Sequence, residues 1–220
     1  MRIELPSGTP AELALPAGTL SRGVALAPDI MGLRPLFDDL CARLAAERGW
    51  AVCAPEPFPD HPNTTVDERM DLVRTRVDER QIGDLVAADA VLRERAGVER
   101  VAVLGFCMGG MYALKASTTG AFDTAVAFYG MIRVPERFNG PGHRQPIDMI
   151  RDGAAAPILA IVGGRDPFTP EEDIDDLEAA GATVVRYPDA EHGFVHDPSR
   201  PAHRADDAAD AWSRVFAFLA

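Results

Sequence analysis

The feature that most constrains this chain is Gly105-Phe-Cys107-Met-Gly109, which joins a strand-like run to a helix-like run. Residues 101–104 are apolar, as in a buried strand, and residues 108–117 have the pattern of a helix. A nucleophile between two glycines at such a junction is the cysteine form of a nucleophile elbow, whose strained backbone requires small neighbours. We therefore predict that Cys107 lies on a sharp turn, where the positive end of the following helix favours its thiolate.

Two other interpretations of this segment stay open from these residues alone. Most unpaired cysteines are inert buried hydrophobes rather than nucleophiles. Glycine-rich turns between a strand and a helix also cradle phosphate groups in nucleotide-binding folds. The flanking strand and helix favour catalysis, and the rest of the chain has to decide between these interpretations.

The composition narrows the class of protein. The 220 residues include 34 acidic and 22 basic side chains, and the resulting net charge of −12 argues against nucleic acid as a partner. The three cysteines, at positions 41, 53 and 107, are too widely spaced for a disulfide framework or a zinc cluster and suit a reducing, cytoplasmic compartment. No apolar run is long enough to span a membrane, and the N-terminus lacks a signal-peptide pattern. We expect a cytoplasmic protein that is a monomer or small homo-oligomer without a membrane partner.

Strand-like and helix-like segments alternate along almost the whole chain. Strands are expected at 2–5, 12–15, 23–27, 50–54, 101–104, 124–129, 157–162 and 183–187. Helices are expected at 36–48, at 67–96 with a break near Gly83, and at 108–117, 170–180 and 205–219. This alternation predicts a single α/β domain over residues 1–220, with a mostly parallel sheet between two layers of helices.

Two stretches interrupt the alternation. Residues 55–62 and 133–153 are rich in proline or glycine, so we expect a loop at the first and a surface excursion at the second. Since ligands of open α/β sheets bind at the carboxyl ends of the strands, either stretch could border a site. Ordinary connecting loops explain both stretches equally well.

A cysteine nucleophile needs a base and a group that orients the base. Asp166 follows the predicted strand 157–162, and His192 lies in the loop after the strand 183–187. Taken singly, an aspartate before a proline is commonly a helix cap, and a loop histidine is commonly a solvated surface residue. The order nucleophile, acid, histidine along the chain is that of α/β-hydrolases, and all three residues follow strands.

Three segments together resemble the motifs of the dienelactone hydrolase family. They are Gly-Phe-Cys-Met-Gly-Gly at 105–110, Gly-Gly-Arg-Asp-Pro at 163–167 and Glu-His-Gly-Phe at 191–194. This family is a branch of the α/β-hydrolases that opens lactones and related esters with a Cys-His-Asp triad. The resemblance covers almost the whole chain and implies an α/β-hydrolase fold without a large lid domain.

The resemblance also implies a role for individual residues. It makes Cys107 the nucleophile, His192 the general base and Asp166 the group that orients the histidine. It implies that the backbone N–H groups of Ile30 and Met108 form the oxyanion hole. The contribution of Met108 is expected independently, because the residue after the nucleophile of an elbow supplies one such donor.

The chain departs from the family pattern at residues near these positions. Asp29 stands where the family typically has a glutamate that contacts the resting thiol, so we expect Asp29 to tune the nucleophile. His196 replaces an arginine that binds a substrate carboxylate, and a second such arginine corresponds to Arg69. We expect Arg69, Tyr129, Phe194 and His196 to contact the substrate, and we expect that substrate not to require a carboxylate.

The sequence therefore predicts hydrolysis of a small carboxylic ester or lactone through a thioester on Cys107. A thioesterase or acyltransferase on the same fold is the first alternative, and a non-catalytic ligand-binding or redox-sensing protein is the second. No metal or organic cofactor is expected. His192, His196 and Asp197 lie in a loop that offers no rigid face for a metal ion.

Overall fold

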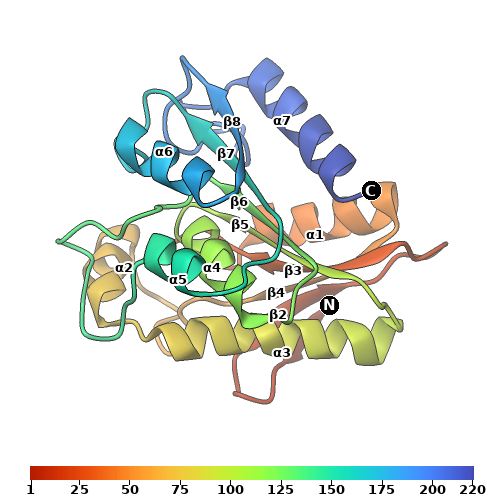
Figure 1. The fold of residues 1–220 in the computed structure, drawn as a ribbon. Coiled ribbons are helices and arrows are strands. Elements are labelled where there is room, and N and C mark those ends of the chain that lie inside the picture. Colours follow the sequence, from red (N-terminus) through yellow and green to blue (C-terminus); the bar gives the residue numbers. More distant parts are fainter.

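An eight-stranded sheet runs through the middle of the molecule, and the computed structural model describes all 220 residues (Figure 1). The strands are β1 (Arg2–Glu4), β2 (Pro10–Ala14), β3 (Arg22–Ala27), β4 (Trp50–Pro55), β5 (Val101–Phe106), β6 (Thr124–Phe128), β7 (Ile158–Gly163) and β8 (Thr183–Tyr187). Their order is β1-β2-β4-β3-β5-β6-β7-β8. Strands β3 to β8 are parallel, and β1 and β2 add an antiparallel edge. This arrangement confirms the predicted α/β-hydrolase fold.

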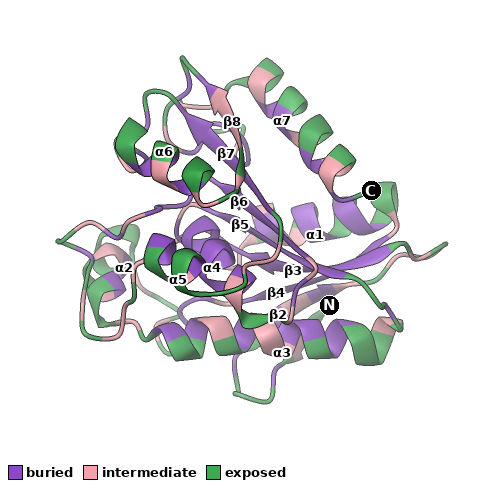
Figure 2. Ribbon diagram, in the orientation of Figure 1, coloured by how far each residue is buried: buried purple, intermediate pink, exposed green.

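Helices cover both faces of the sheet (Figures 1 and 2). Helices α1 (Pro35–Arg48) and α7 (Ala205–Phe218) pack on one face. The other face is covered by α3 (Asp78–Ala96), α4 (Met108–Ala116), α5 (Pro146–Asp152) and α6 (Glu171–Ala179). Helix α2 (Val66–Leu72) continues into a 3-10 turn at Val73–Thr75, and a second such turn spans Ser117–Thr119.

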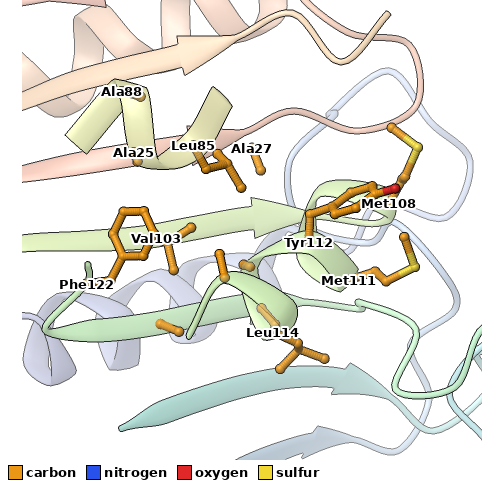
Figure 3. Close-up of a cluster of buried hydrophobic side chains, with 14 of the residues drawn as sticks. Ala25, Ala27, Leu85, Ala88, Val103, Met108, Met111, Tyr112, Leu114 and Phe122 are labelled. Carbon is orange, nitrogen blue, oxygen red and sulfur yellow. The ribbon is translucent and has the colours of Figure 1, made fainter. Parts of the chain in front are cut away.

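The sheet divides the interior into two apolar clusters. Strands β3 to β7 are buried along their whole length, because helices cover both of their faces. Leu85 of α3 and Leu114 of α4 pack over Val103 of β5 in one cluster (Figure 3). In the other cluster, Phe37 and Leu44 of α1 pack on the opposite side of the same strands. The carboxyl ends of the parallel strands are thereby held at one edge of the sheet.

Two expectations about local structure were wrong. The break in the long helical segment lies at residues 76–77 rather than at Gly83. Gly83 lies within α3, where a side chain would point into open space, so the glycine does not interrupt the helix. The stretch 133–153 is not simply a surface excursion, since it contains α5 and buries Phe138 and Ile147 against the core.

A buried polar cluster joins α4, α3 and the stretch 133–153. Lys115, the only lysine of the chain, is fully buried at the end of α4. Its Nζ lies 2.6 Å from Oδ1 of Asp78 and 3.4 Å from Nδ1 of His143. Oδ2 of Asp78 accepts the Arg144 N–H at 2.7 Å, and Nε2 of His143 donates to the Val73 carbonyl at 2.8 Å. Burial lowers the pKa of Lys115, and the Asp78 carboxylate opposes that shift.

We expect Lys115→Met to destabilise the fold by about 3–5 kcal/mol, because Asp78 would keep a buried charge without its main partner. Urea unfolding at neutral pH measures this loss. Arg165→Met is the matched control, since Arg165 pairs with Asp189 at 2.6 Å on the exposed surface. That variant should change the stability little. Equal, small effects of both substitutions would contradict the assignment of Lys115 as a structural charge.

Candidate active site

The nucleophile candidate lies on a strained turn between β5 and α4. Cys107 has φ 57° and ψ −118°, which is an unfavourable region for a residue with a side chain. Close backbone packing maintains this conformation. A Cβ atom at Gly105 would lie 2.0 Å from the carbonyl oxygen of Gly109, and one at Gly109 would lie 2.1 Å from that of Ala27. Both glycines of the motif are therefore required by sterics.

The acid and the histidine come from the neighbouring strand ends. Asp166 follows β7 and is buried, and His192 lies in the loop after β8. Nδ1 of His192 lies 2.8 Å from Oδ2 of Asp166, and Oδ1 of Asp166 accepts the Phe168 N–H at 2.9 Å. The opposite ring nitrogen of His192, Nε2, is buried and hydrogen-bonds to no other residue. His192 and Cys107 line the same cavity, so this nitrogen is available for proton transfer there.

The charge of the site favours a protonated histidine. Burial alone would lower the pKa of His192, because it disfavours the imidazolium. The negative charge of the Cys107 thiolate and the hydrogen bond with Asp166 outweigh burial and raise the pKa of His192 to about 10. His192 can thus keep its proton at neutral pH when Cys107 is ionised.

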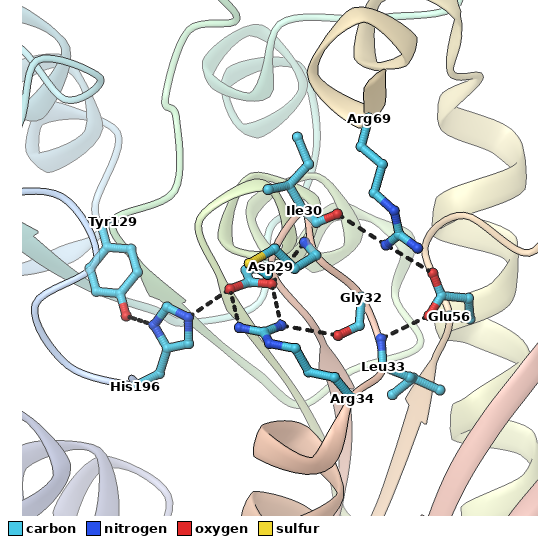
Figure 4. A network of polar contacts seen from close by, with 10 residues as sticks. Asp29, Ile30, Gly32, Leu33, Arg34, Glu56, Arg69, Tyr129 and His196 are labelled. Atoms are coloured by element: carbon cyan, nitrogen blue, oxygen red, sulfur yellow. Dashed lines mark hydrogen bonds and ion pairs between the residues drawn. The ribbon is translucent and has the colours of Figure 1, made fainter. Parts of the chain in front are cut away.

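Two residues with unpaired backbone N–H groups line the same cavity. Met108 is the first residue of α4, so its N–H has no partner within the helix. The N–H of Ile30, in the loop after β3, makes no hydrogen bond within the chain. Both residues line the cavity together with Cys107. The Ile30 carbonyl accepts a hydrogen bond from Nη1 of Arg69 at 3.2 Å, which holds this loop from behind (Figure 4).

Asp29 is the centre of a buried network rather than a direct partner of Cys107 (Figure 4). Its Oδ1 accepts from Nη1 of Arg34 at 2.7 Å and from the Met31 N–H at 2.9 Å. Its Oδ2 accepts from Nη2 of Arg34 at 2.9 Å and from Nε2 of His196 at 2.8 Å. Burial would raise the pKa of Asp29, but His196 and Arg34 lower it to about 2. The carboxylate is therefore ionised and fully engaged.

The four expected substrate contacts need correction, because none of them lines the cavity. Arg69 is buried and pairs with Glu56 at 3.4 Å. The hydroxyl of Tyr129 lies 2.5 Å from Nδ1 of His196, whose other nitrogen binds Asp29. Tyr129 and Phe194 are fully buried. These side chains support the loops from the interior and do not reach the substrate side.

The cavity itself has a volume of about 390 Å³. Six apolar residues of its lining, here called the apolar wall, are Val66, Met70, Val73, Met131, Phe138 and Phe168. The charged residues Arg34, Asp197 and Arg200 also line the cavity. Sequence motifs did not reveal these residues. The only signal was the interruption at 133–153, which contributes Phe138 to the wall.

Neither a metal centre nor a membrane segment is found. No group of three or more His, Cys, Asp and Glu side chains is arranged to hold a metal ion. None of the helices combines the length and the apolar composition needed to cross a bilayer.

A sequence profile of the Dienelactone hydrolase family matches residues 10–220. The chain belongs to the dienelactone hydrolase family. It is 31% identical to the carboxymethylenebutenolidase of Rhodococcus opacus, over 89% of this chain and 79% of that protein. An Escherichia coli K12 protein classed as a carboxymethylenebutenolidase is 33% identical, over 87% of this chain and 74% of its own.

The fold agrees with this membership of the dienelactone hydrolase family. A solved Klebsiella pneumoniae protein classed as a dienelactone hydrolase superposes with a TM-score of 0.85 at 27% identity. The superposition covers 100% of this chain and 97% of that one. The family profile and the relatives identify the chain as a carboxylic ester hydrolase.

We expect Asp29→Asn to lower kcat by roughly tenfold, which corresponds to about 1.4 kcal/mol of lost transition-state stabilisation. The physical reason is that an uncharged side chain holds Arg34 and His196 less firmly, so the Ile30 N–H loses its fixed direction. Steady-state kinetics on a small aryl ester measures the change. Asp152→Asn, which alters an exposed pair with Arg144, is the control. An unchanged kcat in the Asp29 variant would show that the network is not needed for catalysis.

Proposed function

We propose that this dienelactone hydrolase cleaves carboxylic esters or lactones by acyl transfer to Cys107. The observation that carries the proposal is the meeting of three elements at one cavity: Cys107 on its strained turn, the His192–Asp166 pair, and two unpaired backbone N–H groups. Each element supplies one requirement of the reaction: nucleophile, proton carrier and oxyanion stabilisation. The relatives named carboxymethylenebutenolidase support lactones as members of the substrate class.

In the first half of the reaction, the Cys107 thiolate attacks the carbonyl carbon and a C–S bond forms. The carbonyl oxygen becomes an oxyanion, which the N–H groups of Ile30 and Met108 stabilise. When the oxyanion collapses, the C–O bond breaks and His192 gives its Nε2 proton to the leaving oxygen. The products of this half are an alcohol and a thioester on Cys107.

In the second half, neutral His192 accepts a proton from water, and the resulting hydroxide attacks the thioester carbonyl. Collapse of this second oxyanion breaks the C–S bond, releases the acid and restores the thiolate beside an imidazolium. Asp166 keeps the Nδ1–H of His192 in place in both halves and stabilises the positive ring. The chemistry requires no redox step.

The first test is the identity of the nucleophile. We expect Cys107→Ala to abolish hydrolysis of an aryl ester and iodoacetamide to inactivate the wild type by labelling Cys107. Burial raises the pKa of Cys53 to about 12 and that of Cys41 still further, so both stay protonated and shielded. Peptide mass spectrometry identifies the labelled thiol. Inactivation that accompanies labelling of Cys41 or Cys53, with Cys107 unmodified, would refute the proposal.

The second test is the pH dependence of kcat/KM. His192 must carry its proton to release the leaving group, and its pKa is raised, so activity should persist well above pH 6.5 and fall only as pH approaches about 10. Asp166→Asn removes a charge that favours the imidazolium, so the alkaline decline should move to lower pH. Asp152→Asn should leave the profile in place. A decline near pH 6.5 in the wild type would contradict the assignment of His192.

A further inference from the structure

Two sets of side chains line the active-site cavity, and they bear on the natural substrate. One set carries the charged groups of Arg34, Asp197 and Arg200. The other set, the apolar wall, carries no charged or hydrogen-bonding side chain. Val73, Met131 and Phe138 are buried, whereas Val66 is 45% exposed at the mouth. An extended apolar group can therefore enter from the mouth and lie against the wall.

The reaction geometry indicates which part of the substrate meets the wall. The leaving oxygen must face His192, since this residue protonates it, and the carbonyl oxygen must face Ile30 and Met108. Helix α2 lies beside the oxyanion loop, because Arg69 of α2 donates to the Ile30 carbonyl. The wall residues Val66 and Met70 come from the same helix. The wall extends from this helix to Phe168, whose ring lies 5.0 Å from the ring of His192. The acyl substituent is thus directed at the α2 end of the wall, and the leaving group at its Phe168 end.

The wall is held in place before any ligand binds. Residues 131–145 lie alongside the segment between α2 and α3. The Asp78 N–H donates to the Gly142 carbonyl at 3.0 Å, and His143 donates to the Val73 carbonyl at 2.8 Å. The buried Lys115–Asp78 pair anchors this junction. A preformed apolar surface binds an apolar group without the entropic cost of ordering a loop.

The side chains of the wall favour apolar groups of varied shape. Four of the seven methionines of the chain line the cavity, at positions 31, 70, 108 and 131. Methionine adapts to irregular ligands because its side chain is flexible and polarisable. The rings of Phe138 and Phe168 lie 6.4 Å apart, and Arg137 stacks on Phe138 at 4.4 Å. Arg137 also lies 5.4 Å from the centroid of the Phe168 ring, away from α2. At the α2 end of the wall, Val66, Met70 and Val73 give a negatively charged acyl terminus no ionic partner.

On the basis of the function proposed above, we propose that the natural substrates are esters with a medium-length alkyl or arylalkyl acyl group, which lies on the apolar wall. Such acyl groups bury methylenes against the wall at a gain of up to about fourfold in affinity for each. The paired state of Arg69, Arg34 and His196 agrees with this substrate class, because each already binds a carboxylate of the protein. Arg200 also lines the cavity and forms no ion pair, and the carboxylate-ended ester described below tests whether it binds a charged acyl group instead.

The test is a series of p-nitrophenyl esters, in which the leaving group stays constant and only the acyl part varies. We expect kcat/KM to rise from acetate through butyrate to hexanoate, by about tenfold or more in total. A p-nitrophenyl ester of matched length that ends in a carboxylate should react at least about tenfold more slowly than the hexanoate. A flat or falling series, or a preference for the charged acyl group, would overturn the proposal.

A variant in the wall tests the location. Met70→Lys places a cation on the wall, so the ratio of hexanoate to acetate activity should fall, and the ratio of the charged ester to hexanoate should rise. Val77→Lys is the matched control, because Val77 is 47% exposed and lies outside the cavity. Both ratios should match the wild type in this control. Unchanged ratios in the Met70 variant would show that the acyl group lies elsewhere.

Failure of the proposed acyl-group preference can be distinguished from failure of the proposed mechanism. If Cys107→Ala retained hydrolysis of the acetate ester, the mechanism itself would fail. If that variant is inactive and the wild type shows no acyl-length preference, the mechanism stands and only the assignment of the wall is refuted.

Discussion

The strained backbone of Cys107 is the constraint on which the rest of the structure depends. A residue other than glycine keeps φ 57° here only because the backbones of β5, α4 and the end of β3 are in direct contact at Gly105 and Gly109. This packing requires a rigid, fully buried sheet beneath the turn. In return, the turn exposes the thiol at the carboxyl edge of the sheet, where the loops carrying Asp166 and His192 also arrive.

The residues proposed to react are positioned by residues outside the proposed reaction. Asp29, beside the proposed oxyanion donor Ile30, binds His196, which is four residues beyond His192. One buried hydrogen bond therefore links the loop of Ile30 to the loop of His192. Arg69 holds the same oxyanion loop from the opposite side through the Ile30 carbonyl. The two loops are fixed relative to one another by charge-assisted hydrogen bonds, which are directional and strong when buried.

The cavity beside these groups is shaped by parts of the chain outside the motifs. Helix α2 and residues 131–145 form most of the apolar wall. Hydrogen bonds from His143 to the Val73 carbonyl and from the Asp78 N–H to the Gly142 carbonyl join residues 131–145 to the segment after α2. Chemistry and selectivity thus reside in different elements. The nucleophile turn serves any acyl transfer, whereas the wall selects the acyl group.

The sequence by itself determined the fold class and the positions of Cys107, Asp166 and His192 after their strands, because apolar periodicity and glycine spacing are local properties. It did not determine which way loop side chains point. His196 and Arg69 were expected to reach the substrate, yet they face Asp29 and Glu56 in the interior. Only the tertiary structure decided this, because a buried charge must pair with an opposite charge from a distant segment, and that partner is not visible in local spacing.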